Sequence, residues 1–198
     1  MNSCDLVLAS ASPRRLELLS AFGLKMQVDP VHVDERPEPG EAPATLAERL
    51  AGKKAAAAAS RHPGRIVLAA DTVVAVDGEV LGKPADGAEA ERMLRRLAGR
   101  RHEVFTAVAT RRDGQALGRL SRSEVDFRTL ESDEIAAYVA TGEPLDKAGA
   151  YGIQGLAAIF VTRLCGSYSG VVGLPLFETA ELLQEFGIGL LCCAGAAA

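Results

Sequence analysis

A short apolar run near the start of the chain stops abruptly at two serines and a proline. Leu6-Val7-Leu8-Ala9 leads straight into Ser10-Ala11-Ser12-Pro13-Arg14-Arg15. The apolar run predicts a buried strand. Ser12 before Pro13 is typical of a helix start, because serine suits the N-cap and proline suits the first helical position. The following leucines predict an apolar helix face that ends near Gly23.

This predicted helix start is suited to binding an anion. Unpaired N–H groups and the helix dipole favour negative charge at a helix N-terminus. Arg14 and Arg15 add two guanidinium groups, which donate hydrogen bonds in pairs to phosphate oxygens. A capped surface helix with two solvated arginines would show the same residues, so this stretch alone leaves both interpretations open.

The charge balance argues against several classes of partner. Lysine and arginine total 22 against 26 acidic residues, a net charge of −4, which disfavours non-specific nucleic-acid binding. No apolar run approaches the ~20 residues that span a bilayer, and no signal peptide is evident. We therefore expect a cytoplasmic protein with neither a nucleic-acid nor a membrane partner.

Helix and strand signals alternate along the rest of the chain. Helices are expected at about Pro43–Ser60, Asp86–Leu97, Ser132–Thr141 and Pro175–Phe186. Extended segments are expected at Lys25–Val33, Ile66–Ala70, Val73–Val76, Glu79–Leu81, His102–Arg111, Leu117–Arg128, Ala158–Arg163 and Val171–Gly173. With no repeat or clear linker, this order predicts one α/β domain over residues 1–190, with a mixed sheet, flanking helices and two lobes around a cleft. Residues 191–198 are expected to form a flexible tail.

Several charged residues fall at boundaries between these elements. Asp71 follows Ile66–Ala70, and ligands of open α/β sheets bind at the C-terminal ends of strands. The hairpin signal Asp77-Gly78 returns the chain so that Lys83 approaches Asp71. Glu35 lies on an acidic, proline-rich loop that predicts a mobile flap. Basic groups combined with carboxylates are what phosphoryl chemistry requires. The cysteines and histidines lack zinc-ligand spacing, so we expect any metal to be a hard cation on carboxylates.

Six blocks occur in an order that resembles the Maf family of nucleoside triphosphate pyrophosphatases. They are Ala9–Arg15, Ala70–Val74, Gly82–Pro84, Thr106–Ala109, Asp146–Gly155 and Gly170–Pro175. The resemblance extends from Leu6 to about Leu183. It implies a fold shared with the inosine triphosphate pyrophosphatases, usually as a homodimer. It also implies hydrolysis between the α- and β-phosphates with Mg²⁺ or Mn²⁺.

The same resemblance implies roles for individual residues. Asp71 is expected to accept a proton from the attacking water, although a carboxylate there could equally ligate the metal. Glu35 either completes the metal shell with Asp71 or is a solvated loop residue. The residues expected to bind the triphosphate are Ser10, Arg14, Arg15, Lys54 and Lys83.

Three positions distinguish branches within that family. Arg14, Thr72 and Gln154 agree with the branch acting on dTTP and UTP, whereas a sister branch preferring 7-methyl-GTP has Trp, Gln and Glu there. Thr72 and Gln154 are therefore expected to read the base, and an amide suits the O4/N3–H edge of uracil or thymine. Tyr151 and Phe160 either stack on the base or pack in the core. The alternative functions are a nucleotide-binding regulator of division with incidental hydrolysis, and an inosine-triphosphate-type activity.

Overall fold

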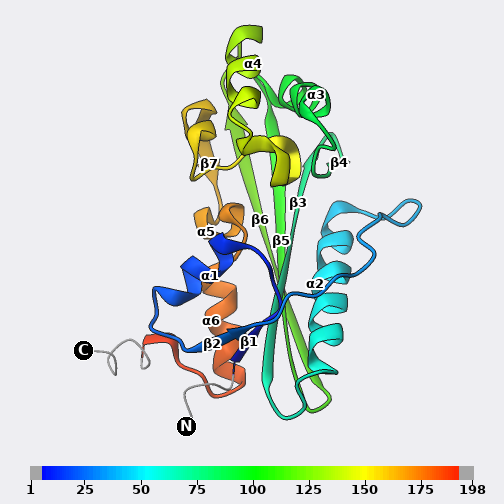
Figure 1. Cartoon of the computed structure of the whole chain (residues 1–198), viewed down its shortest axis with the longest axis vertical. Helices are drawn as coiled ribbons and strands as arrows, with labels where there is room; N and C mark the ends of the chain where they lie inside the picture. The colour runs from blue at the N-terminus through cyan, green and yellow to red at the C-terminus, as the bar shows by residue number, and fades with distance from the viewer. Residues whose placement is uncertain (1–5, 192–198) are drawn as a thin grey trace.

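The computed structural model describes residues 6–191, which form a seven-stranded mixed sheet with helices on both faces (Figure 1). The strands are β1 (Leu6–Leu8), β2 (Met26–Val28), β3 (Ile66–Val76), β4 (Glu79–Leu81), β5 (Arg101–Arg112), β6 (Gln115–Phe127) and β7 (Val161–Cys165). Their order is β2-β1-β3-β5-β6-β7, with β4 paired to β3. The α-helices are α1 (Pro13–Ser20), α2 (Pro43–Ala59), α3 (Gly87–Leu97), α4 (Ser132–Ala140), α5 (Tyr168–Val172) and α6 (Leu176–Glu185). Three 3₁₀ turns are η1 (Glu143–Asp146), η2 (Ala148–Ala150) and η3 (Leu156–Phe160).

Two lobes share the long strands β3, β5 and β6, which run the length of the molecule (Figure 1). In the lower lobe β1, β2 and the first half of β3 are parallel. Helix α2 covers one face there, while α1 and α6 pack together against the other face. In the upper lobe α3, α4 and the 3₁₀ turns enclose a separate core with the far ends of the long strands. The predicted mixed α/β fold with flanking helices is confirmed.

Strand β3 is buried on both faces in the lower lobe. Val67 and Ala69 pack toward α2, and Ile66 and Leu68 pack toward α6, because successive side chains of a strand point to opposite faces. A strand covered on both sides is apolar throughout rather than alternating. This explains the apolar run in the sequence. A charged side chain is unusual in such a buried strand, and Asp71 is one.

Asp71 lies in the middle of β3, so the prediction that it ends a strand was wrong. The strand that ends is its parallel neighbour β1: after Leu8, the Ala9 N–H donates one last hydrogen bond to the Leu68 carbonyl (2.8 Å) and the chain turns away. Beyond that point β3 loses its parallel neighbour. Asp71 therefore still lies next to the C-terminal end of a parallel strand.

Other local predictions also differ from the structure. Val171–Gly173 was expected to be extended, but residues Tyr168–Val172 form α5, whose N-terminus is capped by Ser167 Oγ accepting from the Gly170 N–H (3.0 Å). Ser12 stands at the N-cap of α1 without a side-chain cap bond. Strand β2 is shorter than expected, and β7 starts three residues after its expected start and ends two residues after its expected end, because Leu156–Phe160 form η3. The predicted tail lies outside the described residues except for Leu191.

Candidate active site

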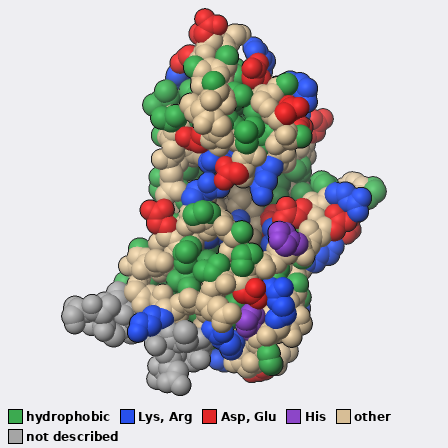
Figure 2. Space-filling model, viewed as in Figure 1, with side chains coloured by type: hydrophobic (Ala, Val, Ile, Leu, Met, Phe, Trp, Pro, Cys, Tyr) green, Lys and Arg blue, Asp and Glu red, His purple; other side chains and the backbone are tan. Residues whose placement is uncertain are grey.

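A cleft of about 860 Å³ separates the two lobes and contains all of the predicted site residues. Figure 2 shows acidic and basic side chains gathered around this hollow at the middle of the molecule. The predicted residues that line it are Ser10, Arg14, Arg15, Glu35, Lys54, Asp71, Thr72, Lys83 and Gln154. The structure therefore brings together groups from the β1–α1 connection, α1, the 34–41 loop, α2, β3, the β4–α3 connection and the glycine-rich segment. Among residues 6–191 no helix is long and apolar enough to cross a bilayer.

Lys54 of α2 lies between two carboxylates at the centre of the cleft. Its Nζ is 2.5 Å from Asp71 Oδ1 and 2.5 Å from Glu35 Oε1. The side chain of Asp71 is 10% exposed, whereas that of Glu35 is 51% exposed. Burial raises the pKa of Asp71, although Lys54 and Arg15 oppose the rise. Partial burial also acts to raise the pKa of Glu35, but Lys54, Lys83 and Arg15 together lower it.

The two carboxylates suit a hard divalent cation. Asp71 Oδ1 and Glu35 Oε1 each lie 2.5 Å from the same nitrogen, Lys54 Nζ. The distance between these two oxygens is therefore at most twice that value. Within the described part of the chain, no three His, Cys, Asp or Glu side chains cluster as a metal site. Mg²⁺ commonly takes only one or two protein carboxylates and completes its shell with phosphate oxygens and water. Asp71 and Glu35 fit that pattern.

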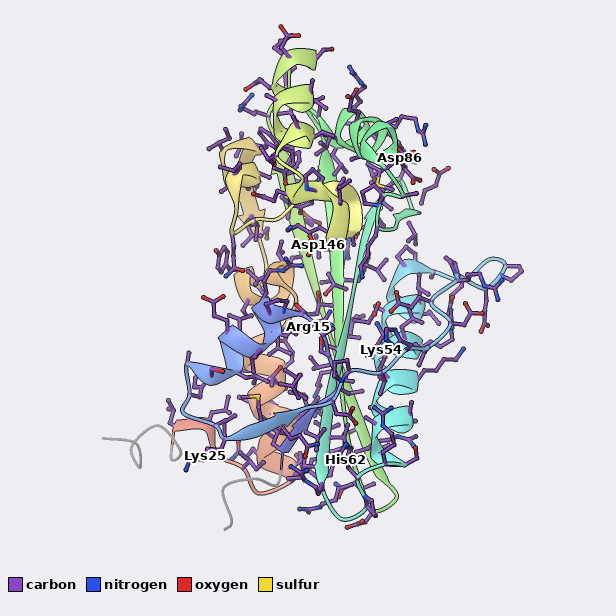
Figure 3. The ribbon with its side chains drawn as sticks, viewed as in Figure 1. Arg15, Lys25, Lys54, His62, Asp86 and Asp146 are labelled. Atoms are coloured by element: carbon purple, nitrogen blue, oxygen red, sulfur yellow. The ribbon has the colours of Figure 1, made fainter. Side chains whose placement is uncertain are left out.

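The adjacent residues Arg14 and Arg15 have different environments. Arg15 is directed inward: its Nε donates to the Gly173 carbonyl (2.7 Å), Nη1 to Ser10 Oγ (3.2 Å) and Nη2 to Thr72 Oγ1 (3.2 Å). Burial lowers the pKa of Arg15, opposed by the charge of Asp71. Arg14 has its side chain 30% exposed and lies 3.5 Å from the exposed carboxylate of Asp146. Figure 3 shows Arg15 and Lys54 at mid-height, with Asp146 above them.

These contacts refine the expectation for the two arginines. A guanidinium has five N–H donors, and Arg15 uses three of them on protein oxygens. Arg15 therefore fixes the positions of Ser10 and Thr72 before any ligand arrives, and it keeps two donors for the cleft. Arg14 is the more available of the pair. The sequence did not predict that the Gly173 carbonyl accepts a hydrogen bond from Arg15. Gly173 does lie in the Gly170–Pro175 block, which was the available sequence signal for this contact.

The glycine-rich segment forms the upper wall of the cleft through η1 and η2. Gly149 has φ +69°, and a Cβ there would lie 2.8 Å from Val74 of β3, so only glycine fits. Glu143 fixes the far end of the segment by accepting from the Leu156 N–H (3.0 Å) and the Tyr138 hydroxyl (2.9 Å). Gln154 is exposed on this wall, and Lys83 is an exposed residue that also lines the cleft. Glu143 and Asp146 were not predicted as individual site residues.

Tyr151 and Phe160 pack in the core of the upper lobe. They are 6% and 2% exposed, and both make edge-on ring contacts with Phe127. The Tyr151 hydroxyl is 2.8 Å from Nε2 of buried His102. The core alternative for these two aromatic residues is therefore confirmed, although Tyr151 also touches the cleft wall.

His102 makes the stability of this wall dependent on pH. Burial lowers the pKa of His102 to about 4, against about 6.5 for an exposed histidine. The unfolded chain thus binds a proton between pH 6.5 and 4 that the folded chain does not. The stabilisation is complete above pH 6.5 and falls by about 3 kcal/mol as the pH drops to 4. Urea unfolding at several pH values checks this, with His102→Gln as the comparison. An equal pH dependence in both proteins would contradict the prediction.

A family model described as Maf-like protein matches residues 5–186, nearly the whole chain. The chain belongs to the Maf family. The match includes every site residue described above. It confirms the resemblance seen in the six sequence blocks.

Two relatives named dTTP/UTP pyrophosphatase match over most of their length. A dTTP/UTP pyrophosphatase of Symbiobacterium thermophilum is 54% identical over 183 residues, covering 92% of this chain and 94% of that protein. A dTTP/UTP pyrophosphatase of Geobacter sulfurreducens is 54% identical over 190 residues, covering 94% and 99%. Among solved structures, the Staphylococcus aureus Ham1 protein matches with a TM-score of 0.51 at 18% identity, covering 91% of this chain and 96% of that one. The Ham1 match shows a shared fold.

Proposed function

We propose that this Maf protein is a nucleoside triphosphate pyrophosphatase that converts dTTP and UTP to the monophosphate and pyrophosphate. The observation that carries the proposal is the buried carboxylate of Asp71, held at the centre of a cleft whose walls supply Arg14, Lys54 and Lys83. A cleft that only binds nucleotides would not need a desolvated carboxylate. The names of the two relatives at 54% identity support the same reaction and substrates.

The residues have distinct parts in this reaction. The triphosphate is bound by Ser10, Arg14, Lys54, Lys83 and the unused donors of Arg15. The positive charges among them stabilise the negative charge that develops on the departing pyrophosphate. Asp71 accepts a proton from the attacking water, and its raised pKa makes it a stronger base than an exposed aspartate. Asp71 and Glu35 would hold a divalent cation, Mg²⁺ or Mn²⁺, which would polarise the phosphate oxygens.

Base selection is proposed for Thr72 and Gln154. Gln154 presents an amide with both donor and acceptor at the exposed wall, which complements the alternating groups on the edge of uracil or thymine. Thr72 contributes one hydroxyl from the floor of the cleft. Buried polar groups left unpaired by a wrong base supply the discrimination.

A substrate panel tests the proposal directly. Pyrophosphate release would be measured from dTTP, UTP, CTP, 7-methyl-GTP and ITP, each with Mg²⁺ or Mn²⁺ and with a chelator as control. We expect metal-dependent release from dTTP and UTP. Preference for 7-methyl-GTP would contradict the base assignment, and preference for ITP would indicate inosine-triphosphate-type activity. Absence of release from all five would overturn the proposal in favour of a nucleotide-binding regulator of division. Homodimer assembly, a cytoplasmic location and the lack of a nucleic-acid partner stay predictions.

A further inference from the structure

The 34–41 loop is tied to α2 by an ion pair that lies outside the cleft. Arg49 of α2 donates through Nε to Glu41 Oε1 (2.5 Å) and through Nη2 to Glu41 Oε2 (2.6 Å), which makes the pair bidentate. The side chains of Arg49 and Glu41 are only 16% and 5% exposed. Neither residue lines the cleft, so the pair can affect a ligand only through the loop.

The same guanidinium also holds the part of the loop that faces the cleft. Arg49 Nη2 donates to the backbone carbonyl of Arg36 (3.1 Å), and since this nitrogen carries two hydrogens, both of its bonds form together. Arg36 directly follows Glu35, which lines the cleft. The Glu38 N–H donates to Glu41 Oε2 (3.0 Å) and closes the loop behind Glu35. One side chain of α2 thus fixes the backbone next to Glu35, where the loop runs beside the start of α2 (Figure 1).

These contacts matter because the carboxylate of Glu35 is half-exposed and shares its ion-pair partner. Lys54 Nζ contacts Glu35, and it contacts Asp71 at the same distance. In the proposed function Lys54 also binds the triphosphate, so its hold on Glu35 weakens when the nucleotide is present. Arg49 lies outside the cleft and keeps its bonds to the loop whether or not the cleft is filled.

We propose that Arg49 is a positioning residue that, paired with Glu41, holds the 34–41 loop so that Glu35 can share a divalent cation with Asp71. This inference rests on the proposed function. Mg²⁺ demands near-ideal geometry from its ligands, and residues that orient a ligand from behind contribute to metal affinity. A loop released from α2 would have to be ordered again each time Glu35 engages the cation.

The loop itself offers a matched control. The side chain of Arg36 is 87% exposed and pairs with Asp34 at 2.6 Å. Arg36→Met removes an arginine and an ion pair from the same loop, but it leaves the backbone carbonyl that Arg49 binds. Arg49→Met removes the guanidinium and keeps an apolar side chain of similar length. Arg49→Lys keeps the charge without the fork.

Calorimetry measures the effect on metal binding without turnover. The Kd of the α,β-imido analogue of dUTP would be measured once with saturating Mn²⁺ and once with EDTA, and the ratio of the two values gives the enhancement of binding by the metal. We expect Arg49→Met to lower this enhancement about tenfold, as does Glu35→Ala, while the Kd in EDTA stays near the wild-type value. Arg36→Met should keep the wild-type enhancement, and Arg49→Lys should keep part of it.

Several outcomes would overturn the inference. One is an Arg49→Met protein whose Kd rises equally with Mn²⁺ and with EDTA, because that pattern indicates a general structural role. Another is an unchanged enhancement in Arg49→Met or in Glu35→Ala. A further fall when Arg49→Met is added to Glu35→Ala also contradicts it, since the effect should pass through Glu35.

Two further results keep the test decisive. If Arg49→Met does not fold, Glu41→Gln keeps the shape of the partner but not its charge, and it should lower the enhancement in the same direction. An unchanged enhancement there would overturn the inference. If the wild type binds the analogue but releases no pyrophosphate from dTTP or UTP, the proposed function fails, while the enhancement still tests the role of Arg49.

Discussion

Asp71→Asn is expected to lower turnover of dTTP and UTP by about 10²- to 10⁴-fold while nucleotide binding persists. Asparagine has nearly the same shape as aspartate and can still accept from Lys54, so the cleft should keep its geometry. It cannot take a proton from water and is a poor ligand for a hard cation. Turnover would be measured as pyrophosphate release, and binding by calorimetry with the α,β-imido analogue of dUTP.

Asp77→Asn is the matched control for this substitution. Asp77 lies at the end of the same strand, in the β3–β4 turn, with φ +53°, a conformation that asparagine tolerates well. Its carboxylate pairs with Arg100 at the surface. Turnover in Asp77→Asn should equal that of the wild type. Substantial activity in Asp71→Asn would refute a catalytic role for Asp71 and would favour another base in the cleft.

Arg15→Lys is expected to destabilise the protein by about 2–3 kcal/mol and to lower turnover at least tenfold. Lysine keeps the charge, but one ammonium cannot reproduce the fork that reaches Ser10, Thr72 and the Gly173 carbonyl together. Buried acceptors would be left unpaired, and the Thr72 hydroxyl would lose its fixed orientation. Urea unfolding gives the free energy of unfolding, and pyrophosphate release gives the turnover.

Arg14→Lys provides the comparison on the neighbouring residue. Arg14 makes one contact of 3.5 Å to an aspartate side chain that is 65% exposed. Pairs of this kind contribute about 0–1 kcal/mol, so the change in stability should stay within that range. Equal destabilisation in the two variants would show that the inward network of Arg15 contributes little to the fold.

Much of the fold could be predicted because local signals and tertiary structure agree. The apolar run Ile66–Ala70 is buried on both faces, and Asp77-Gly78 forms the predicted hairpin with positive φ at both residues. The helices α2 and α3 begin at or next to their predicted starts, because Pro43 and Asp86 act locally. Asp71 was singled out because it directly follows the apolar run, where ligands of open α/β sheets bind, and because one of the six blocks contains it.

Some features depend on contacts that no local pattern contains. Val171 and Val172 have high strand propensity, yet they are helical because the Ser167 cap and Gly173, at φ +127°, define a short helix. The difference between Arg14 and Arg15 depends on a carbonyl 158 residues away from Arg15. The contacts of Thr106 and Glu143 likewise arise only after β3 meets β5 and the glycine-rich segment closes over the cleft.

The long strands also determine how the molecule can come apart. β3 and β5 pair without interruption from Val67 opposite Arg111 to Ala75 opposite Glu103, which takes the ladder through both lobes. Within residues 6–191 these strands connect the lobes directly, without a flexible linker between them, and the hydrogen bonds of one lobe continue into the other along the same ladder. The site lies across the middle of this shared ladder, and we expect the two lobes to unfold together. Its walls can adjust through their loops, while the distance between the lobes is held by the backbone itself.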